Sequence, residues 1–277
     1  MRAQFKKRPD KVSATGLIAG GGSLPLQFLK GAAEKKEKVI TFGIAGETGN
    51  TIKKTAEEYV EVNLTALSSI IKECKARGVK QVLFLGYVRH TNLFKNIKFD
   101  LKSLSIIAGL KGFTAVQIMG GIIKQFEKDG IKVLPSTHLM ENSLAGKGNI
   151  SLKKPDKKQM ADIQFGYKTA RTIAAMDAGQ TVVIKKGGII ALEAQEGTDN
   201  CIKRGGGIAG PGFVVVKTAR PNQDMRYDVP VMGLKTLKAI KALNGAGIAV
   251  EAGKTFILEP EKVKLYAKNN GLFIYGA

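Results

Sequence analysis

Acidic residues gather in the stretch 193–233 of an otherwise basic chain. One group lies in Glu193–Asp199 and the other in Arg220–Pro230. Glycine and proline interrupt both groups, so we expect these carboxylates on loops at strand ends, although Asp199 could instead cap the helix that follows it. Mg²⁺ binds carboxylates on such loops together with substrate phosphates. The stretch therefore predicts metal-assisted chemistry on phosphate, with catalytic candidates Asp228, Asp199, Glu196 and Asp224.

Basic side chains accompany these acids. Arg204, Arg226 and Lys217 are candidate contacts for phosphoryl oxygens, whose negative charge must be neutralised during hydrolysis. Arg226 lies between Asp224 and Asp228, and all three would point to one face if the segment is extended. The arginine could then contact phosphate or simply form ion pairs with its acidic neighbours, and the sequence leaves both interpretations open.

A glycine-rich turn near the start of the chain is a second candidate site. The apolar run Thr15–Ala19 leads into three glycines, and an amphipathic helix follows from Ser23, with Pro25 in its first turn. Backbone N–H groups of such a turn can bind phosphate at the helix N-terminus, but the same residues could form only a tight turn. The spacing is not GxGxxG and no acid is placed to bind a ribose, which argues against a dinucleotide site.

Composition limits the classes of function. The chain has 44 Lys+Arg against 23 Asp+Glu, a net charge of +21, which favours contact with nucleic acid or with an anionic membrane surface. Aromatic residues make up 6% and tryptophan is absent, so stacking platforms and nucleic-acid motifs are missing. We therefore expect no specific nucleic-acid partner. Cys74 and Cys201 stand alone, which predicts neither disulfides nor zinc and favours a reducing compartment.

Alternating strand and helix patterns predict an α/β protein of two domains. The continuous apolar run Val82–Leu85 is typical of a parallel sheet. We expect a flexible basic tail over 1–12, a Rossmann-like N-terminal domain over 13–134, a linker over 135–158 and a distinct mixed α/β catalytic domain over 159–277. No apolar run is long enough to span a membrane, and no signal peptide follows the basic start.

Several segments, in this order, resemble one known family. They are Gly16–Pro25, Ser136–Thr137, Asp162–Gly166, Asp177–Gln180, Glu193–Asp199, Lys203–Arg204, Gln223–Pro230 and Glu251–Thr255. This set resembles the I-type (LpxI) family of UDP-2,3-diacylglucosamine pyrophosphatases of lipid A biosynthesis. The segments Glu193–Asp199 and Gln223–Pro230 are the most specific, and the resemblance covers almost the whole chain after the basic tail.

The resemblance implies a reaction and its partners. Water attacks the β-phosphorus of UDP-2,3-diacylglucosamine and releases UMP and 2,3-diacylglucosamine 1-phosphate, with Mg²⁺ as cofactor. Asp228 is the implied essential residue, and Asp228 with Asp199 are the metal candidates. The resemblance also implies a homodimer, a lipid held between the domains, and a cytoplasmic enzyme peripherally associated with the inner-membrane surface. Candidate substrate contacts are Gly20, Gly21, Gly22, Ser23, Leu24, Thr137, Thr198, Arg204, Lys217, Gln223 and Arg226.

Two other functions remain as alternatives. A nucleotide-sugar or lipid-binding protein without catalysis would keep the same fold but release no UMP. A basic nucleic-acid-binding protein would show binding that weakens steeply as the salt concentration rises. The apolar helices expected within 103–128 could supply a groove for the acyl chains or could pack only in the core.

Overall fold

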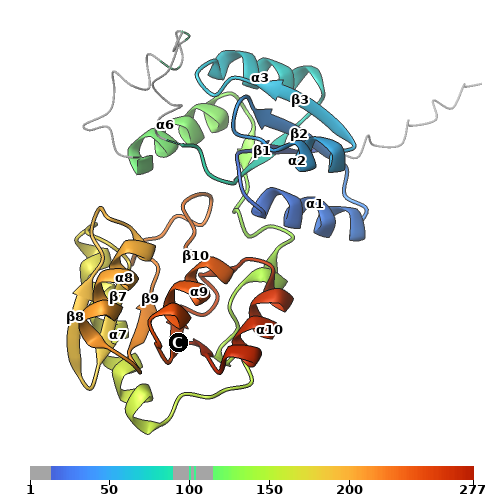
Figure 1. The fold of residues 1–277 in the computed structure, drawn as a ribbon. Helices are drawn as coiled ribbons and strands as arrows, with labels where there is room; N and C mark the ends of the chain where they lie inside the picture. The colour runs from blue at the N-terminus through green and yellow to red at the C-terminus, as the bar shows by residue number, and fades with distance from the viewer. Residues whose placement is uncertain (1–13, 90–99, 101–102, 104–114) are drawn as a thin grey trace, which may run out of the picture. The chain divides into compact units, whose positions relative to one another are not determined.

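The computed structural model describes residues 14–89, 100, 103 and 115–277 (Figure 1). The chain divides into two compact units, Met1–Pro135 and Ser136–Ala277. The basic tail predicted over 1–12 lies outside the described residues. Of the helices expected over 103–128, residues 104–114 also lie outside them. No described helix is both long enough and apolar enough to cross a membrane.

The first unit contains a parallel five-stranded sheet with the strand order β3-β2-β1-β4-β5. The order reverses between β1 and β4, as in doubly wound folds, which confirms the Rossmann-like prediction. Strand β1 is buried along its whole length, because helices pack against the sheet through side chains such as Phe28 and Ile70. The strands are β1 Thr15–Ala19, β2 Val39–Ile44, β3 Glu58–Val62, β4 Gln81–Leu85 and β5 Lys132–Val133, and the helices are α1 Leu24–Glu34, α2 Asn50–Thr55, α3 Leu67–Ala76 and α6 Ala115–Lys128.

The second unit contains a mixed six-stranded sheet with the order β6-β13-β11-β9-β7-β8. Strands β9, β11 and β13 are parallel, whereas β7, β8 and β6 each run antiparallel to their neighbours. The strands are β6 Gly148–Asn149, β7 Thr181–Lys185, β8 Gly188–Leu192, β9 Val214–Lys217, β11 Gly247–Val250 and β13 Phe273–Gly276. Strands β10 Val231–Met232 and β12 Phe256–Ile257 form a small separate parallel pair.

Helices cover both faces of this sheet. Helix α7, Lys157–Ala175, packs on one face against Val214 and Val216, while Val215 points to the opposite face and packs in the cluster formed with α8, α9 and α10. This alternation follows from the two-residue period of a strand. Gly166 lets α7 approach closely, since a Cβ there would lie 2.7 Å from the Val216 side chain. The other helices are α8 Thr198–Ala209, α9 Leu234–Ala242 and α10 Pro260–Asn270, with the short 3₁₀ helix η1 at Glu141–Ser143.

The segment expected as a linker packs against the second unit. Strand β6 pairs with β13, and the Ala145 N–H donates to the carbonyl of Thr255 at 2.8 Å. Asp156 then caps α7 in a reciprocal arrangement with Gln159, which explains why the helix begins there. From Ser136 onward the chain therefore contributes to the sheet and core of the second unit.

Candidate functional site

A polar pocket lies in the second unit where β9 ends. Its volume is about 290 Å³, and its walls come from the turn after α7, the end of β8, the end of β9 and the loop 218–230 that follows β9. Ligands of α/β sheets commonly bind at the carboxyl ends of parallel strands. The pocket is lined by Asp177, Ala178, Gly179, Gln180, Glu193, Ala194, Lys217, Arg220, Asp228, Val229, Pro230 and Val231.

Lys217 ends β9 and places an ammonium group at this pocket. Its Nζ donates to Thr198 Oγ1 at 3.0 Å, and Thr198 Oγ1 donates to Glu193 Oε1 at 3.0 Å. Burial lowers the pKa of Lys217, although the negative charges of Glu193, Asp199 and Asp228 act in the opposite direction. Within the described part of the chain the Lys217 ammonium forms no direct ion pair, and its contact with a phosphoryl group stays a prediction.

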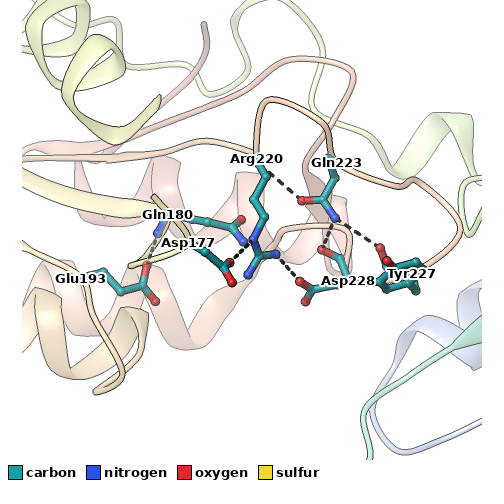
Figure 2. A network of polar contacts seen from close by, with 7 residues as sticks. All are labelled: Asp177, Gln180, Glu193, Arg220, Gln223, Tyr227 and Asp228. Atoms are coloured by element: carbon teal, nitrogen blue, oxygen red, sulfur yellow. Dashed lines mark hydrogen bonds and ion pairs between the residues drawn. The ribbon is translucent and has the colours of Figure 1, made fainter. Parts of the chain in front are cut away.

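Arg220 joins two carboxylates of the pocket (Figure 2). Its Nε donates to Asp177 Oδ1 at 2.7 Å, and its Nη1 donates to Asp228 Oδ2. With the Gln180 amide oriented so that its oxygen points to Arg220, this oxygen accepts from the same Nη1 at 3.0 Å. The side chains of Asp177 and Asp228 are 58% and 50% exposed, so both carboxylates remain open to solvent and to a ligand.

The loop 218–230 holds Asp228 in an unusual backbone conformation. The φ angle of Asp228 is +54°, in the left-handed region that non-glycine residues rarely adopt. The side chain of Gln223 supports this turn, because its Nε2 donates to the carbonyl oxygens of Asp228 at 3.0 Å and Tyr227 at 3.3 Å (Figure 2). Backbone strain of this kind is concentrated at functional sites. Gln223 was predicted as a substrate contact, and here it shapes the loop.

A buried carboxylate fixes the beginning of the same loop. Glu251 follows β11, and its Oε2 accepts from the Ala219 N–H at 2.9 Å. Its Oε1 accepts from Arg171 at 3.0 Å and forms an ion pair with Lys254 at 2.9 Å. The loop therefore leaves β9 in a direction set by a neighbouring parallel strand.

The other predicted acids lie outside the pocket lining. Asp224 forms a two-pronged pair with Arg226, at 3.0 Å to Nε and 2.7 Å to Nη2. Arg226 therefore pairs with one acidic neighbour, as in the second interpretation above, while Asp228 pairs with Arg220 instead. The segment is a turn rather than the extended strand considered above. Hydrogen bonds from Arg226 lower the pKa of Asp224.

Glu196 and Asp199 also have basic partners of their own. Arg204 Nη2 contacts Glu196 at 2.5 Å and lowers the pKa of that carboxyl, and it donates to the Leu192 carbonyl at 2.8 Å. Lys235 Nζ lies 2.6 Å from Asp199. The interpretation of Asp199 as helix cap is wrong, because Gly197 occupies the N-cap position of α8.

In the glycine turn of the first unit, two backbone N–H groups form hydrogen bonds with carbonyl groups at the end of β4 and just after it. The N–H groups of Gly20 and Gly21 donate to the carbonyls of Leu85 and Tyr87 at 2.8 and 2.9 Å. A Cβ at Gly20 would lie 2.5 Å from the Tyr87 oxygen, so glycine is required by this close approach. Gly22 has a φ of +95°, and Leu24 begins α1. Ser23 stands at the N-cap position, but its hydroxyl makes no capping hydrogen bond.

Thr137 lies in the turn after the first residues of the second unit. The preceding residue, Ser136, donates from its backbone to the Met225 carbonyl at 2.7 Å and from its hydroxyl to the Arg226 carbonyl at 2.8 Å. These bonds hold the turn 136–139 beside the loop 218–230. Thr137 thus directly follows a residue that is bonded to the loop 218–230, but it does not itself line the pocket.

The pocket fits only one mode of Mg²⁺ binding. Among the described residues, no group of three or more His, Cys, Asp or Glu side chains is arranged to hold a metal ion. Mg²⁺ often binds through one or two carboxylates and completes its shell with water and substrate phosphates. The half-exposed Asp228 carboxylate suits that mode, whereas an ion enclosed entirely by protein ligands does not fit.

Sequence reasoning missed three residues of the pocket. Asp177 and Gln180 were quoted for the resemblance but were given no chemical role, and Arg220 opens the second acidic segment. Arg220 and Asp177 are separated by 43 positions yet share a hydrogen bond. The available signal was that Asp177–Gln180 directly precedes one apolar run of the sequence and Arg220 closely follows another.

The fold and the pocket define a two-unit α/β protein with a polar, charge-bearing site at the strand ends of its second unit. Sequence models of the LpxI N-terminal domain and the LpxI C-terminal domain match residues 14–143 and 146–275. The chain belongs to the LpxI family.

One curated relative covers nearly the full length. The UDP-2,3-diacylglucosamine pyrophosphatase LpxI of Caulobacter vibrioides is 28% identical over 274 residues, which is 94% of this chain and 96% of the relative. This similarity extends through both units and includes the loop that carries Asp228.

Similarity to solved structures is weak. The biotin carboxylase domain of Hydrogenobacter thermophilus 2-oxoglutarate carboxylase is 11% identical, covers 64% of this chain and 36% of its own, and has a TM-score of 0.26. Phosphoribosylglycinamide synthetase from Anaerococcus prevotii is 10% identical, covers 66% and 40%, and has a TM-score of 0.23. The chain spans less than half the length of these proteins, and the scores support no functional argument.

Proposed function

We propose that the protein hydrolyses the pyrophosphate of UDP-2,3-diacylglucosamine to UMP and 2,3-diacylglucosamine 1-phosphate, a step of lipid A biosynthesis. The observation that carries the proposal is the half-exposed Asp228 carboxylate in a pocket that also contains the Lys217 ammonium. The name of the full-length relative supports the choice of substrate.

The hydrolysis needs an oriented water and neutralisation of phosphoryl charge. The Asp228 carboxylate orients the water and accepts its proton as the water oxygen bonds to the β-phosphorus. The bond from the β-phosphorus to the bridging oxygen then breaks, and that oxygen leaves with UMP. Lys217 faces the developing negative charge, and its ammonium is held at the pocket by Thr198.

Mg²⁺ is the proposed cofactor. When bound, it supplies positive charge to the phosphoryl oxygens. Asp228 would hold it. Asp199, the second metal candidate, pairs with Lys235 and does not line the pocket, so Asp228 is the stronger candidate.

The substrate places the enzyme at a lipid surface. A diacylated sugar nucleotide lies in a membrane, and the net charge of +21 favours contact with an anionic bilayer. We therefore propose a cytoplasmic enzyme peripherally associated with the inner membrane, acting as a homodimer. Co-sedimentation with anionic vesicles and light scattering test these two statements, and absence of binding or a monomeric mass contradicts them.

The activity is tested with purified protein, UDP-2,3-diacylglucosamine in detergent micelles and Mg²⁺, with release of UMP as the measurement. Asp228→Asn is expected to lower turnover by about 10²–10⁴-fold, the usual contribution of a general base, while lipid binding is retained. Glu261→Gln, which removes an exposed ion pair on α10, is the matched control.

Two outcomes contradict the proposal. Lipid binding without UMP release, with EDTA making no difference, would indicate a non-catalytic binding protein. Tight binding of duplex DNA at physiological salt, with no lipid binding, would indicate a nucleic-acid-binding protein.

A further inference from the structure

Arg220 has two carboxylate partners that are held by different parts of the fold. Asp177 follows α7 directly, and the N–H groups of Asp177 and Ala178 donate to the carbonyls of Ala174 and Ile173 at 3.2 and 3.1 Å. The end of the helix therefore fixes Asp177. Asp228 instead lies in the loop 218–230. One guanidinium thus connects a fixed carboxylate to a carboxylate on a loop.

The residue type at position 177 is informative. Asp177 has a φ of +57° at the residue that follows the helix cap, a position where glycine is the usual choice. An aspartate in this position adopts a left-handed backbone conformation that is less favourable for it than for glycine. In return it supplies a side chain that is 58% exposed and bound to Arg220. Half-exposed ion pairs contribute little to stability. The contact is therefore better explained by the position that it gives to the guanidinium.

Arg220 retains a donor for a further ligand. Its Nε and Nη1 are bound within the pocket, whereas Nη2 has no partner among the described residues. Arginine can bind phosphoryl oxygens through two adjacent N–H groups. In the same contact, Arg220 occupies Oδ2 of Asp228, the carboxylate that must act on water and cation in the proposed reaction.

We propose that Arg220 is a phosphoryl contact that leaves Asp228 when a pyrophosphate enters, and that Asp177 is the positioning residue that keeps its Nε in place. This inference rests on the proposed function for the identity of the substrate. The pyrophosphate then takes Nη1 and Nη2, and Oδ2 of Asp228 becomes available for its role. Asp177 thus acts only through Arg220.

The experiment measures binding of inorganic pyrophosphate with Mg²⁺ by calorimetry, in the full chain. Arg220→Ala is expected to weaken binding by about tenfold or more, the range for a hydrogen bond to a charged group. Asp177→Gly removes the carboxylate and supplies the residue that this helix end favours, so its melting temperature should be unchanged or higher while affinity falls severalfold. Glu261→Gln is again the control and should bind as wild type.

The double variant Asp177→Gly/Arg220→Ala isolates the positioning role. It should bind no more weakly than Arg220→Ala alone, since Asp177 acts through the missing arginine. Millimolar guanidinium should restore part of the affinity of Arg220→Ala but not that of the double variant. A purely structural role for Asp177 would not produce this difference.

The outcomes also separate this inference from the activity. If the wild type binds pyrophosphate but releases no UMP from the lipid, the proposed function fails and the affinities of the variants still decide the role of Arg220. No pyrophosphate binding by the wild type, unchanged binding in Arg220→Ala, or equal guanidinium rescue in both backgrounds overturns the inference.

Discussion

Glu251 connects β11 to the loop that carries Asp228, so its removal should affect both stability and activity. Its side chain is only 6% exposed. It accepts hydrogen bonds from Ala219 and Arg171 and forms an ion pair with Lys254. In Glu251→Ala the Ala219 N–H, which is fully buried, loses its acceptor. Arg171 and Lys254 are 33% and 40% exposed, so water can solvate them.

These contacts set the magnitude. An unsatisfied buried N–H costs about 1–3 kcal/mol, and loss of the partly exposed ion pairs adds about 0–1 kcal/mol. The free energy of unfolding of the second unit should therefore fall by about 1–4 kcal/mol, or about 4–16 °C in melting temperature for a domain of this size. Turnover should fall as well, because the loop loses the bond that sets its direction.

Calorimetry of the full chain and the UMP assay measure the two effects. Glu251→Gln is expected to lose less stability, because its side-chain oxygen can still accept from Ala219. Lys254→Ala, which leaves the bonds to Ala219 and Arg171 in place, should change the melting temperature by only about 1–3 °C. A melting temperature of Glu251→Ala within 1 °C of wild type would refute the reasoning, because the buried N–H would then have another partner.

Three further predictions follow from single contacts. Asp228→Asn should lose turnover and keep lipid binding, as measured by UMP release and lipid co-purification, and wild-type turnover would remove Asp228 from the site. Arg226 lowers the pKa of Asp224 below its ordinary value of 3.8, so this stabilisation is complete above that pH and is lost as the pH falls through the lower folded value. Asp224→Asn should therefore reduce the acid sensitivity of the melting temperature, and an unchanged pH profile contradicts the pair. Gly20→Ala would place a Cβ 2.5 Å from the Tyr87 oxygen and should destabilise the first unit by about 1–3 kcal/mol in urea unfolding, whereas Gly46→Ala, with no atom within 4 Å but a φ of +76°, separates backbone strain from this clash.

The sequence was informative where local pattern and tertiary structure agree. Apolar runs such as Val82–Leu85 became buried parallel strands, and Pro25 took its expected place in the first turn of α1. Glycine and proline indicated that the two acidic segments lie on loops and at a helix start. Glycine adopts backbone conformations that other residues avoid, and proline fixes its φ angle and lacks an N–H donor.

The sequence did not predict which acidic residue pairs with which basic residue. The residue types alone made Asp199, Asp224 and Glu196 candidates beside Asp228, and only the family resemblance ranked Asp228 first. In the structure each of the other three lies beside its own basic partner outside the pocket lining. With 44 Lys and Arg residues in the chain, many partners are possible for every acid, and their choice depends on distances between distant segments. The pairing of distant strands was also hidden, since the segment expected as a linker contains a short strand that pairs with the final strand of the chain.

The amino-acid sequence by itself determined the α/β class, the Rossmann-like first unit and the family, because hydrophobic period and motif order are local properties of the chain. Only the tertiary structure decided which acids share a pocket. Hydrogen bonds between side chains extend over about 3 Å, so Arg220 can join Asp177 to Asp228 only after α7, β9 and their loops have packed on one sheet.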